Sequence, residues 1–240
     1  MSSETETKTK DMSTSMRTLI LIFGVLLSLQ AQAQITFGVR GGTTFNTISQ
    51  TEVLDAVTPD LDYLVGFSGA IYTNIPVADN ISFQPELAYS QKGFALSQGA
   101  DIDLFGAPLP LGVVANSHFN YLDIPLLFKA SFGQDALQGF VMAGPAVGYA
   151  LSGRLKTKAN GLLDLNLTNT EINLDAINYE RFEFSGVVGA GMSYQTGFGA
   201  VSLDGRFQQG FTELYDIPLV AEKVKNKGFA INLGLNFNIN

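Results

Sequence analysis

The sequence of 240 residues contains no cysteine, no tryptophan and a single histidine, His118. Without cysteine the chain forms no disulfide, no thiolate metal site and no thiol nucleophile, and it lacks the lipid-attachment residue of a bacterial lipoprotein. Charged residues are also scarce, at 15% of the chain against about 25% in an average globular domain. The net charge of −8 argues against nucleic acid as a partner, because no basic surface is available to neutralise phosphates.

Chemical motifs are equally scarce. The sequence has no EF-hand spacing, no glycine-rich phosphate loop and no zinc pattern, so no cofactor and no metal site are predicted. His118 follows Ser117, and neighbouring residues of a strand point to opposite faces, which places them poorly as a nucleophile and its base. We therefore predict no catalytic residue. An outer-leaflet lipid-modifying enzyme is the alternative that this pair leaves open.

The N-terminal segment 1–33 has the pattern of a signal peptide. An apolar run over 18–29 follows Arg17 and ends at Ala31-Gln32-Ala33, a small-x-small cleavage pattern. The run is shorter than the roughly 20 residues that a helix needs to cross a bilayer. We predict an exported chain whose mature domain covers 34–240, with Met16 as an alternative start of translation.

The most regular pattern is in the last thirteen residues, 228–240. Their odd positions from Phe229 to Ile239 are all apolar, whereas their even positions are alanine, glycine or asparagine. Because side chains alternate faces along a strand, this segment has one apolar face and one face of small or amide residues. A helix would scatter the same residues around its axis.

Seven further segments show similar patterns, which predicts eight strands. The connections alternate between long ones, at 48–63, 98–117, 154–178 and 212–227, and short turns. Long-short alternation and an even strand count are typical of an all-β, eight-stranded antiparallel up-and-down transmembrane β-barrel with both termini in the periplasm. The predicted strands cover about 35–47, 64–77, 81–97, 118–132, 138–153, 179–195, 198–211 and 228–240.

A soluble lipocalin-like barrel that binds a ligand is the alternative for these strands, because it has the same two faces inverted. A soluble surface needs many charges, and the polar faces here are mostly glycine, serine, threonine, asparagine and glutamine. Such side chains suit the narrow interior of an eight-stranded barrel. We therefore predict that the apolar face meets lipid and that the polar face lines the lumen.

The few charges in the strands all fall on the predicted inner face, where we expect a network of ion pairs. In an antiparallel pair of strands, the residue numbers of directly opposite residues have a constant sum. Glu86 with Lys129 and Lys92 with Asp123 have the same sum, so we predict two direct cross-strand ion pairs in one register. Their favoured role is to fix the core; a narrow pore is the alternative, although eight strands enclose side chains and not a channel. The predicted network comprises Arg40, Glu86, Lys92, Asp123, Lys129, Glu183, Asp204 and Arg206.

Three prolines, Pro85, Pro125 and Pro145, fall inside predicted strands, although proline removes a donor from the ladder. We expect local β-bulges to accommodate them.

Two motifs carry a family resemblance. Residues 83–93, Phe-Gln-Pro-Glu-Leu-Ala-Tyr-Ser-Gln-Lys-Gly, and residues 121–129, Tyr-Leu-Asp-Ile-Pro-Leu-Leu-Phe-Lys, resemble the PorT-like outer-membrane β-barrel family. The segment 38–42 and Ala143-Gly144-Pro145 are similar to that family too. The resemblance implies an eight-stranded outer-membrane barrel with prolines in its strands. The family's name member serves a protein-secretion system, a role that no residue of this chain singles out.

Function is expected at the loops, where barrels carry their variable chemistry. We predict a non-enzymatic integral protein of the bacterial outer membrane with loop-mediated binding or an envelope-structural role. The expected partners are outer-membrane lipid, the outer-membrane assembly machinery and an unidentified protein at the extracellular loops, and the chain is expected to be a monomer. The first two long loops could also hold divalent cations, although a solvated acidic rim is favoured. Their acidic residues are Glu52, Asp55, Asp60, Asp62, Asp101 and Asp103.

Overall fold

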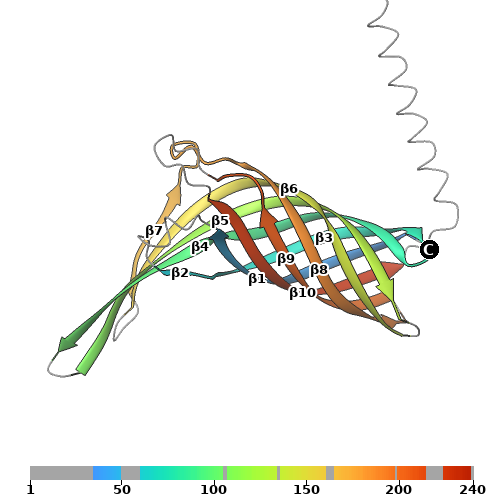
Figure 1. The fold of residues 1–240 in the computed structure, drawn as a ribbon, viewed down its shortest axis with the longest axis horizontal. Coiled ribbons are helices and arrows are strands. Elements are labelled where there is room, and N and C mark those ends of the chain that lie inside the picture. Colours follow the sequence, from blue (N-terminus) through green and yellow to red (C-terminus); the bar gives the residue numbers. More distant parts are fainter. Residues whose placement is uncertain are drawn as a thin grey trace, which may run out of the picture.

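The computed structural model of the chain describes residues 35–49, 60–104, 107–133, 136–160, 165–197, 199–214 and 224–238, which form a closed antiparallel β-barrel (Figure 1). The predicted signal peptide lies outside the described residues. Within these ranges no helix is long and apolar enough to cross a membrane. The eight-stranded barrel predicted from the sequence is confirmed.

Eight strands close the barrel in the order β4-β3-β1-β10-β9-β8-β6-β5, and β5 pairs with β4 again. Two short strands, β2 and β7, add to β4 and β6 outside this ring. Thr36 of β1 pairs with Asn238 of β10, so the first and last strands meet at one end of the barrel, which we call the terminal end. The opposite end is called the loop end. The strands are β1 (Thr36–Ser49), β2 (Asp60–Asp62), β3 (Leu64–Ala78), β4 (Ile81–Leu104), β5 (Ala107–Phe132), β6 (Leu137–Asn160), β7 (Leu165–Ile172), β8 (Phe182–Thr196), β9 (Gly199–Gly210) and β10 (Lys225–Asn238).

Side chains alternate between an apolar outer face and a polar lumen, as the last strand illustrates. Leu233 of β10 is 63% exposed, whereas its neighbour Asn232 is 1% exposed. Phe229, Ile231, Leu235 and Phe237 also point outward. Aromatic residues pair on the outside, for example Tyr149 with Phe182 at 4.9 Å between ring centroids. This distribution buries amides and exposes large apolar side chains, which is the arrangement expected for a surface in contact with lipid.

Strands β4 and β5 continue far beyond the barrel at the loop end. Beyond the lumen residues Lys92 and Phe119, their ladder runs without interruption to Leu104, opposite Ala107. We call this extension, with β2 on one side and β6–β7 on the other, the wing (Figure 1). The predicted loop over 98–117 was therefore wrong, because alternating residues there continue the hairpin.

The other three predicted long loops also contain strand, since β10 begins at Lys225 within 212–227. Within 154–178, β6 continues to Asn160 and pairs with β7. Within 48–63, Asp60–Asp62 forms β2 on the edge of β4. Of the acidic residues proposed for cation binding, Glu52 and Asp55 lie outside the described residues. The other four lie on strands, so they do not form acidic loops.

The prolines inside strands interrupt one ladder each without a bulge. On one side of its strand each proline still has a partner: Pro85 pairs with β5, Pro125 with β6 and Pro145 with β8. On the other side, the ladder with the strand that precedes in the sequence lacks the residue pairs next to the proline, but its register is the same before and after this gap. The prediction of bulges at these positions was wrong. A strand residue directs its N–H to only one neighbour, so the missing donor affects only one side.

Candidate functional site

The lumen holds a first group of four ionised side chains, which we call the Glu86 cluster. Arg40 of β1 donates from Nε and Nη2 to Glu86 Oε2 at 2.9 and 2.8 Å. Arg206 of β9 donates from Nη1 to both oxygens of Glu86 at 2.8 and 3.0 Å, and from Nε to Asp204 Oδ1 at 2.7 Å. Asn232 donates to Asp204 Oδ1 at 2.9 Å. Two arginines and two carboxylates therefore balance one another.

A second group, the Lys92 cluster, lies closer to the loop end. Lys92 Nζ of β4 contacts Asp123 Oδ1 of β5 and Glu183 Oε1 of β8, each at 2.9 Å. Ser90 donates a hydrogen bond to Asp123, and Asn226 donates one to Glu183. The Lys92 ammonium also sits over the Tyr121 ring, 4.3 Å from its centroid. One cation and two carboxylates give this cluster a formal charge of −1.

Both clusters are almost completely removed from solvent. The side chain of Glu86 is 0% exposed and that of Glu183 is 1% exposed. Desolvation of several charges is compensated only when each group finds opposite charges and hydrogen bonds, which the two clusters provide. The clusters therefore fix the positions of five barrel strands relative to one another: β1, β4, β5, β8 and β9.

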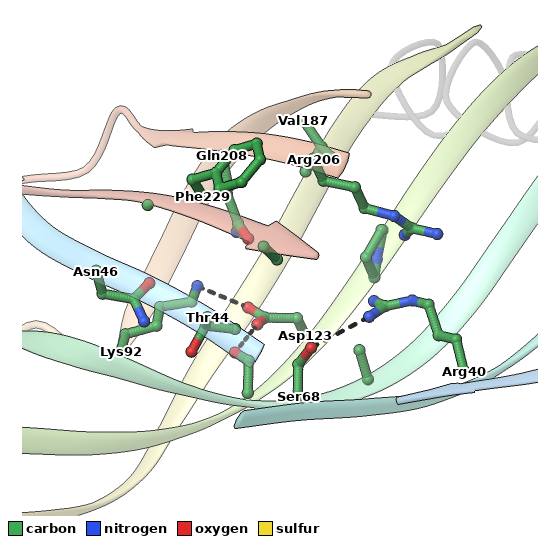
Figure 2. A pocket seen from close by; sticks show the side chains of 15 residues that line it. Arg40, Thr44, Asn46, Ser68, Lys92, Asp123, Val187, Arg206, Gln208 and Phe229 are labelled. Carbon is green, nitrogen blue, oxygen red and sulfur yellow. Dashed lines mark hydrogen bonds and ion pairs between the residues drawn. The ribbon is translucent and has the colours of Figure 1, made fainter. Parts of the chain in front are cut away.

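A cavity of about 50 Å³ separates the two clusters. Figure 2 shows Lys92 and Asp123 on one side and the guanidinium groups of Arg40 and Arg206 on the other. Such a volume admits water but no substrate, because one water needs about 10–15 Å³ on this measure. In the described part of the chain, no group of three or more carboxylate and histidine side chains is arranged to hold a metal ion.

The loop end of the lumen is closed by apolar side chains, which we call the mouth cluster. Tyr179 stacks on Phe119 at 4.7 Å between ring centroids, and its hydroxyl lies 2.6 Å from that of Tyr121. Leu174 and Tyr179 come from the segment between β7 and β8, which folds back into the opening. The cluster comprises Phe119, Tyr121, Ala150, Leu174, Tyr179 and Leu214.

A second apolar group fills the lumen beside the Glu86 cluster. It comprises Leu127, Phe140, Met142, Ala146 and Val187. Lys129 lies against this group with its Nζ 4.0 Å from the centroid of the Phe140 ring. The lumen is thus filled by charged and apolar side chains that pack against one another, as expected for eight strands.

The structure places all eight predicted lumen charges on the inner face but pairs them differently from the prediction. Lys92 and Asp123 form an ion pair, whereas Glu86 contacts Arg40 and Arg206 in place of Lys129. The predicted register was wrong by four residues, since Ser82 lies opposite Lys129 and Ala88 opposite Asp123. Long side chains reach partners diagonally and across the lumen, so direct opposition is no requirement for an ion pair.

Ser117 and His118 point to opposite faces, as their adjacency in a strand requires. Ser117 is buried in the lumen, and His118 lies half-buried on the outer face near Arg154, which is opposite it in β6. The pKa of His118 is lowered by partial burial and by the charges of Lys156 and Arg154. The two side chains are therefore not arranged as a nucleophile and its base.

The mouth cluster was the main omission of the sequence analysis. Leu174 and Leu214 fall in segments predicted as loops, and Tyr179 was predicted to begin a strand that starts at Phe182 in the structure, so their burial at the opening was not predicted. Tyr121 and Asn226 could have been found, because both occupy inner positions of strands and have polar atoms that need partners.

A sequence profile for the outer membrane protein beta-barrel domain matches residues 30–216, most of the chain. The protein belongs to this family. It is accordingly an integral β-barrel protein of the bacterial outer membrane. The finer assignment to PorT-like members remains a resemblance. No curated protein matches the sequence significantly.

Similar solved structures include two small outer-membrane barrels. Ail, the attachment invasion locus protein of Yersinia pestis, has 12% identity, with 85% of this chain and 99% of that chain covered and a TM-score of 0.40. The outer membrane protein OprG from Pseudomonas aeruginosa has 12% identity, 88% and 99% coverage and a TM-score of 0.40.

Proposed function

We propose that this protein is a non-enzymatic outer-membrane barrel that binds a protein partner at the cell surface through its wing. The observation that carries the proposal is the uninterrupted β4–β5 ladder, which continues past the barrel to Leu104 and Ala107. Flexible loops would be sufficient to connect barrel strands, whereas a paired ribbon holds a recognition surface in place.

The packed lumen supports this proposal over a pore. A solute would have to pass the mouth cluster, the Lys92 cluster and the Glu86 cluster in turn. Each layer is made of side chains that contact one another, and eight strands leave no room for an aqueous path beside them. Transport through the lumen would require these layers to separate, at the cost of exposing buried charges.

The edges of the wing offer a physical mode of binding. β2 adds three residues to the edge of β4, and β7 adds eight to the edge of β6. Edge strands have one row of backbone N–H and C=O groups directed away from the sheet, which can pair with a strand of another protein. We propose β-strand addition to the wing, whose edges the β4–β5 ribbon holds in place, as the mode of partner binding.

The proposed orientation places both termini in the periplasm and the wing outside the cell. Short connections such as Asp79-Asn80 lie at the terminal end, and outer-membrane barrels have their short turns in the periplasm. Residues 228–240 would then be the segment that the assembly machinery recognises, and the barrel would function as a monomer.

Replacing residues 97–114 by Asn-Gly tests the role of the wing. Leu96 and Ala115 lie directly opposite each other, so a two-residue turn of this type can close the shortened hairpin. We expect heat-modifiable gel migration to persist while surface cross-linking to the partner is lost. The matched control replaces Asp79-Asn80 by Asn-Gly at the other end. Retention of the same cross-linked species by the shortened protein would contradict the proposal.

Three further measurements address the alternatives. In planar bilayers we expect no stepwise conductance from the purified protein, whereas a narrow pore would conduct. Lipid or ester hydrolysis that disappears in His118→Ala would favour an enzyme instead. A role in protein secretion would require export to fail when the chain is deleted.

A further inference from the structure

Lys129 differs from the other seven lumen charges, because it forms no ion pair with another described residue. Among the described residues, no carboxylate lies within 4 Å of its Nζ, and its one close partner is the Phe140 ring. The nearest cluster offers no spare acceptor, since Glu86 and Asp204 already accept from two arginines and two amides. The Lys92 cluster has one negative charge in excess, and Lys129 carries one positive charge. No carboxylate of the described residues lies beside Lys129 to balance it.

Lys129 lines a cavity of about 240 Å³ at the terminal end of the lumen, which we call the cup. This volume is far larger than the 10–15 Å³ or so that one water needs, and it is below the size of typical sites for drug-sized ligands. The wall is formed mainly by hydroxyl and amide side chains from several strands. They are Thr36, Asn74, Ser82, Ser131, Gln138, Ser193, Gln195, Asn236 and Asn238.

The cup is reached from the terminal end. A neighbouring cavity of about 210 Å³ shares Pro76, Ser82, Ser131 and Gln138 with it and extends to the turns at Asp79-Asn80 and Gly133. The carboxylate of Asp79 lies in this outer cavity and does not line the cup. The mouth cluster closes the other end of the lumen, so a ligand would enter and leave on one side only.

We propose that the cup binds a small oxyanion, a carboxylate or a phosphate. Its negative charge would pair with the Lys129 ammonium, which the Phe140 ring holds in position. The surrounding hydroxyl and amide side chains would donate hydrogen bonds to its oxygens. Figure 2 shows that the smaller cavity between the two charge clusters has different lining residues, among them Lys92 and Arg206. The cup is therefore a separate site.

The test is a titration of the full chain, purified in a non-ionic detergent and low chloride, with glycolate, inorganic phosphate, acetate and sodium chloride. Shifts of the Lys129 ε-methylene and Phe140 ring resonances report occupancy. We expect glycolate or phosphate to saturate these shifts, and the stronger of the two identifies the ligand class. Acetate should also saturate the shifts, because it carries the same carboxylate as glycolate, and chloride should not compete at equal concentration.

Two variants remove the proposed charge in different ways. Lys129→Gln deletes the cation, whereas Ser82→Asp places a carboxylate directly opposite Lys129 in the β4–β5 register. Each should weaken binding at least about tenfold, the effect of losing one charge-assisted hydrogen bond. Calorimetry measures affinity in the variants, and heat-modifiable migration confirms that they fold.

Lys156→Gln is the matched control, because it removes the same charge from a residue that does not line the cup. Its affinity should remain that of the unchanged protein. Titrations without saturation for all three organic and inorganic oxyanions would overturn the proposal. Equal affinity in Lys129→Gln would overturn it as well, and so would retained affinity in Ser82→Asp, in which Lys129 is still present.

Discussion

Glu86 and Arg206, 120 residues apart in the sequence, join opposite walls of the barrel through hydrogen bonds of 2.8 and 3.0 Å. Four steps around the ring separate β4 from β9 in either direction. Arg40 binds the same carboxylate from β1, so three strands meet at one side chain. Removal of this carboxylate leaves two buried guanidinium groups with fewer partners.

Glu86→Gln is accordingly expected to destabilise the barrel strongly. Loss of one partner from a buried ion pair leaves an uncompensated charge and costs about 3–5 kcal/mol. We expect the midpoint of urea unfolding in detergent micelles or lipid vesicles to fall correspondingly. Glu171→Gln is the control, since Glu171 forms an exposed pair with Arg154 at 3.4 Å that contributes little. Equal effects of the two variants would show that the Glu86 cluster is not held as described.

The register of β4 and β5 can be tested by cross-linking, because the chain has no native cysteine. Tyr89 and Leu122 are direct partners on the outer face. Directly opposite Cα atoms lie about 4.5–5.5 Å apart, within reach of a disulfide. We expect Tyr89→Cys with Leu122→Cys to form an intramolecular disulfide on oxidation. The pair at Tyr89 and Leu126, which the four-residue shift would place opposite, should remain reduced.

Sequence alternation was sufficient to predict the barrel, because lipid and lumen impose opposite polarity on successive residues of every strand. In β10, Leu233 and Asn232 show this directly, with one exposed and the other buried. The inner location of all eight charges followed from the same alternation. Strand ends were harder: β4 and β5 continue through 98–117, where polar and apolar residues fit a loop as well as a ribbon.

Ion-pair partners could not be predicted, because they are set by geometry across the lumen. A strand-by-strand argument considers only neighbours such as β4 and β5, whereas Lys92 also binds Glu183 of β8 and Arg40 binds Glu86 across β3. The same limit applies to Tyr179, whose burial depends on the path of a segment between strands. Packing of that kind has no period in the sequence.

Tyr179→Ala is expected to open the mouth of the barrel. The substitution removes the ring that stacks on Phe119 and the hydroxyl beside Tyr121, and truncation of a buried aromatic residue costs about 3–5 kcal/mol. We expect a lower unfolding midpoint and faster hydrogen exchange of the backbone amides of residues 174–181. Tyr63→Ala, at an exposed aromatic residue before β3, is the control and should leave both quantities nearly unchanged.

Leu233→Arg tests which medium meets the apolar face. Leu233 is the central member of the outward row from Phe229 to Phe237 and is 63% exposed, so in a membrane it lies near the bilayer midplane. An arginine at that depth costs about 2–4 kcal/mol, and the cost falls to about 0–1 near the interfaces. Reversible unfolding into lipid vesicles should therefore show a large loss for Leu233→Arg. Tyr194→Arg, at the terminal end of β8, should show a small loss of stability.

In a water-exposed barrel the same arginine would be tolerated at both positions, since exposed surface substitutions usually change stability by less than about 0.5 kcal/mol. A strong dependence on depth is thus a property of a lipid-facing surface, and equal stability of the two variants would contradict the membrane assignment of this face.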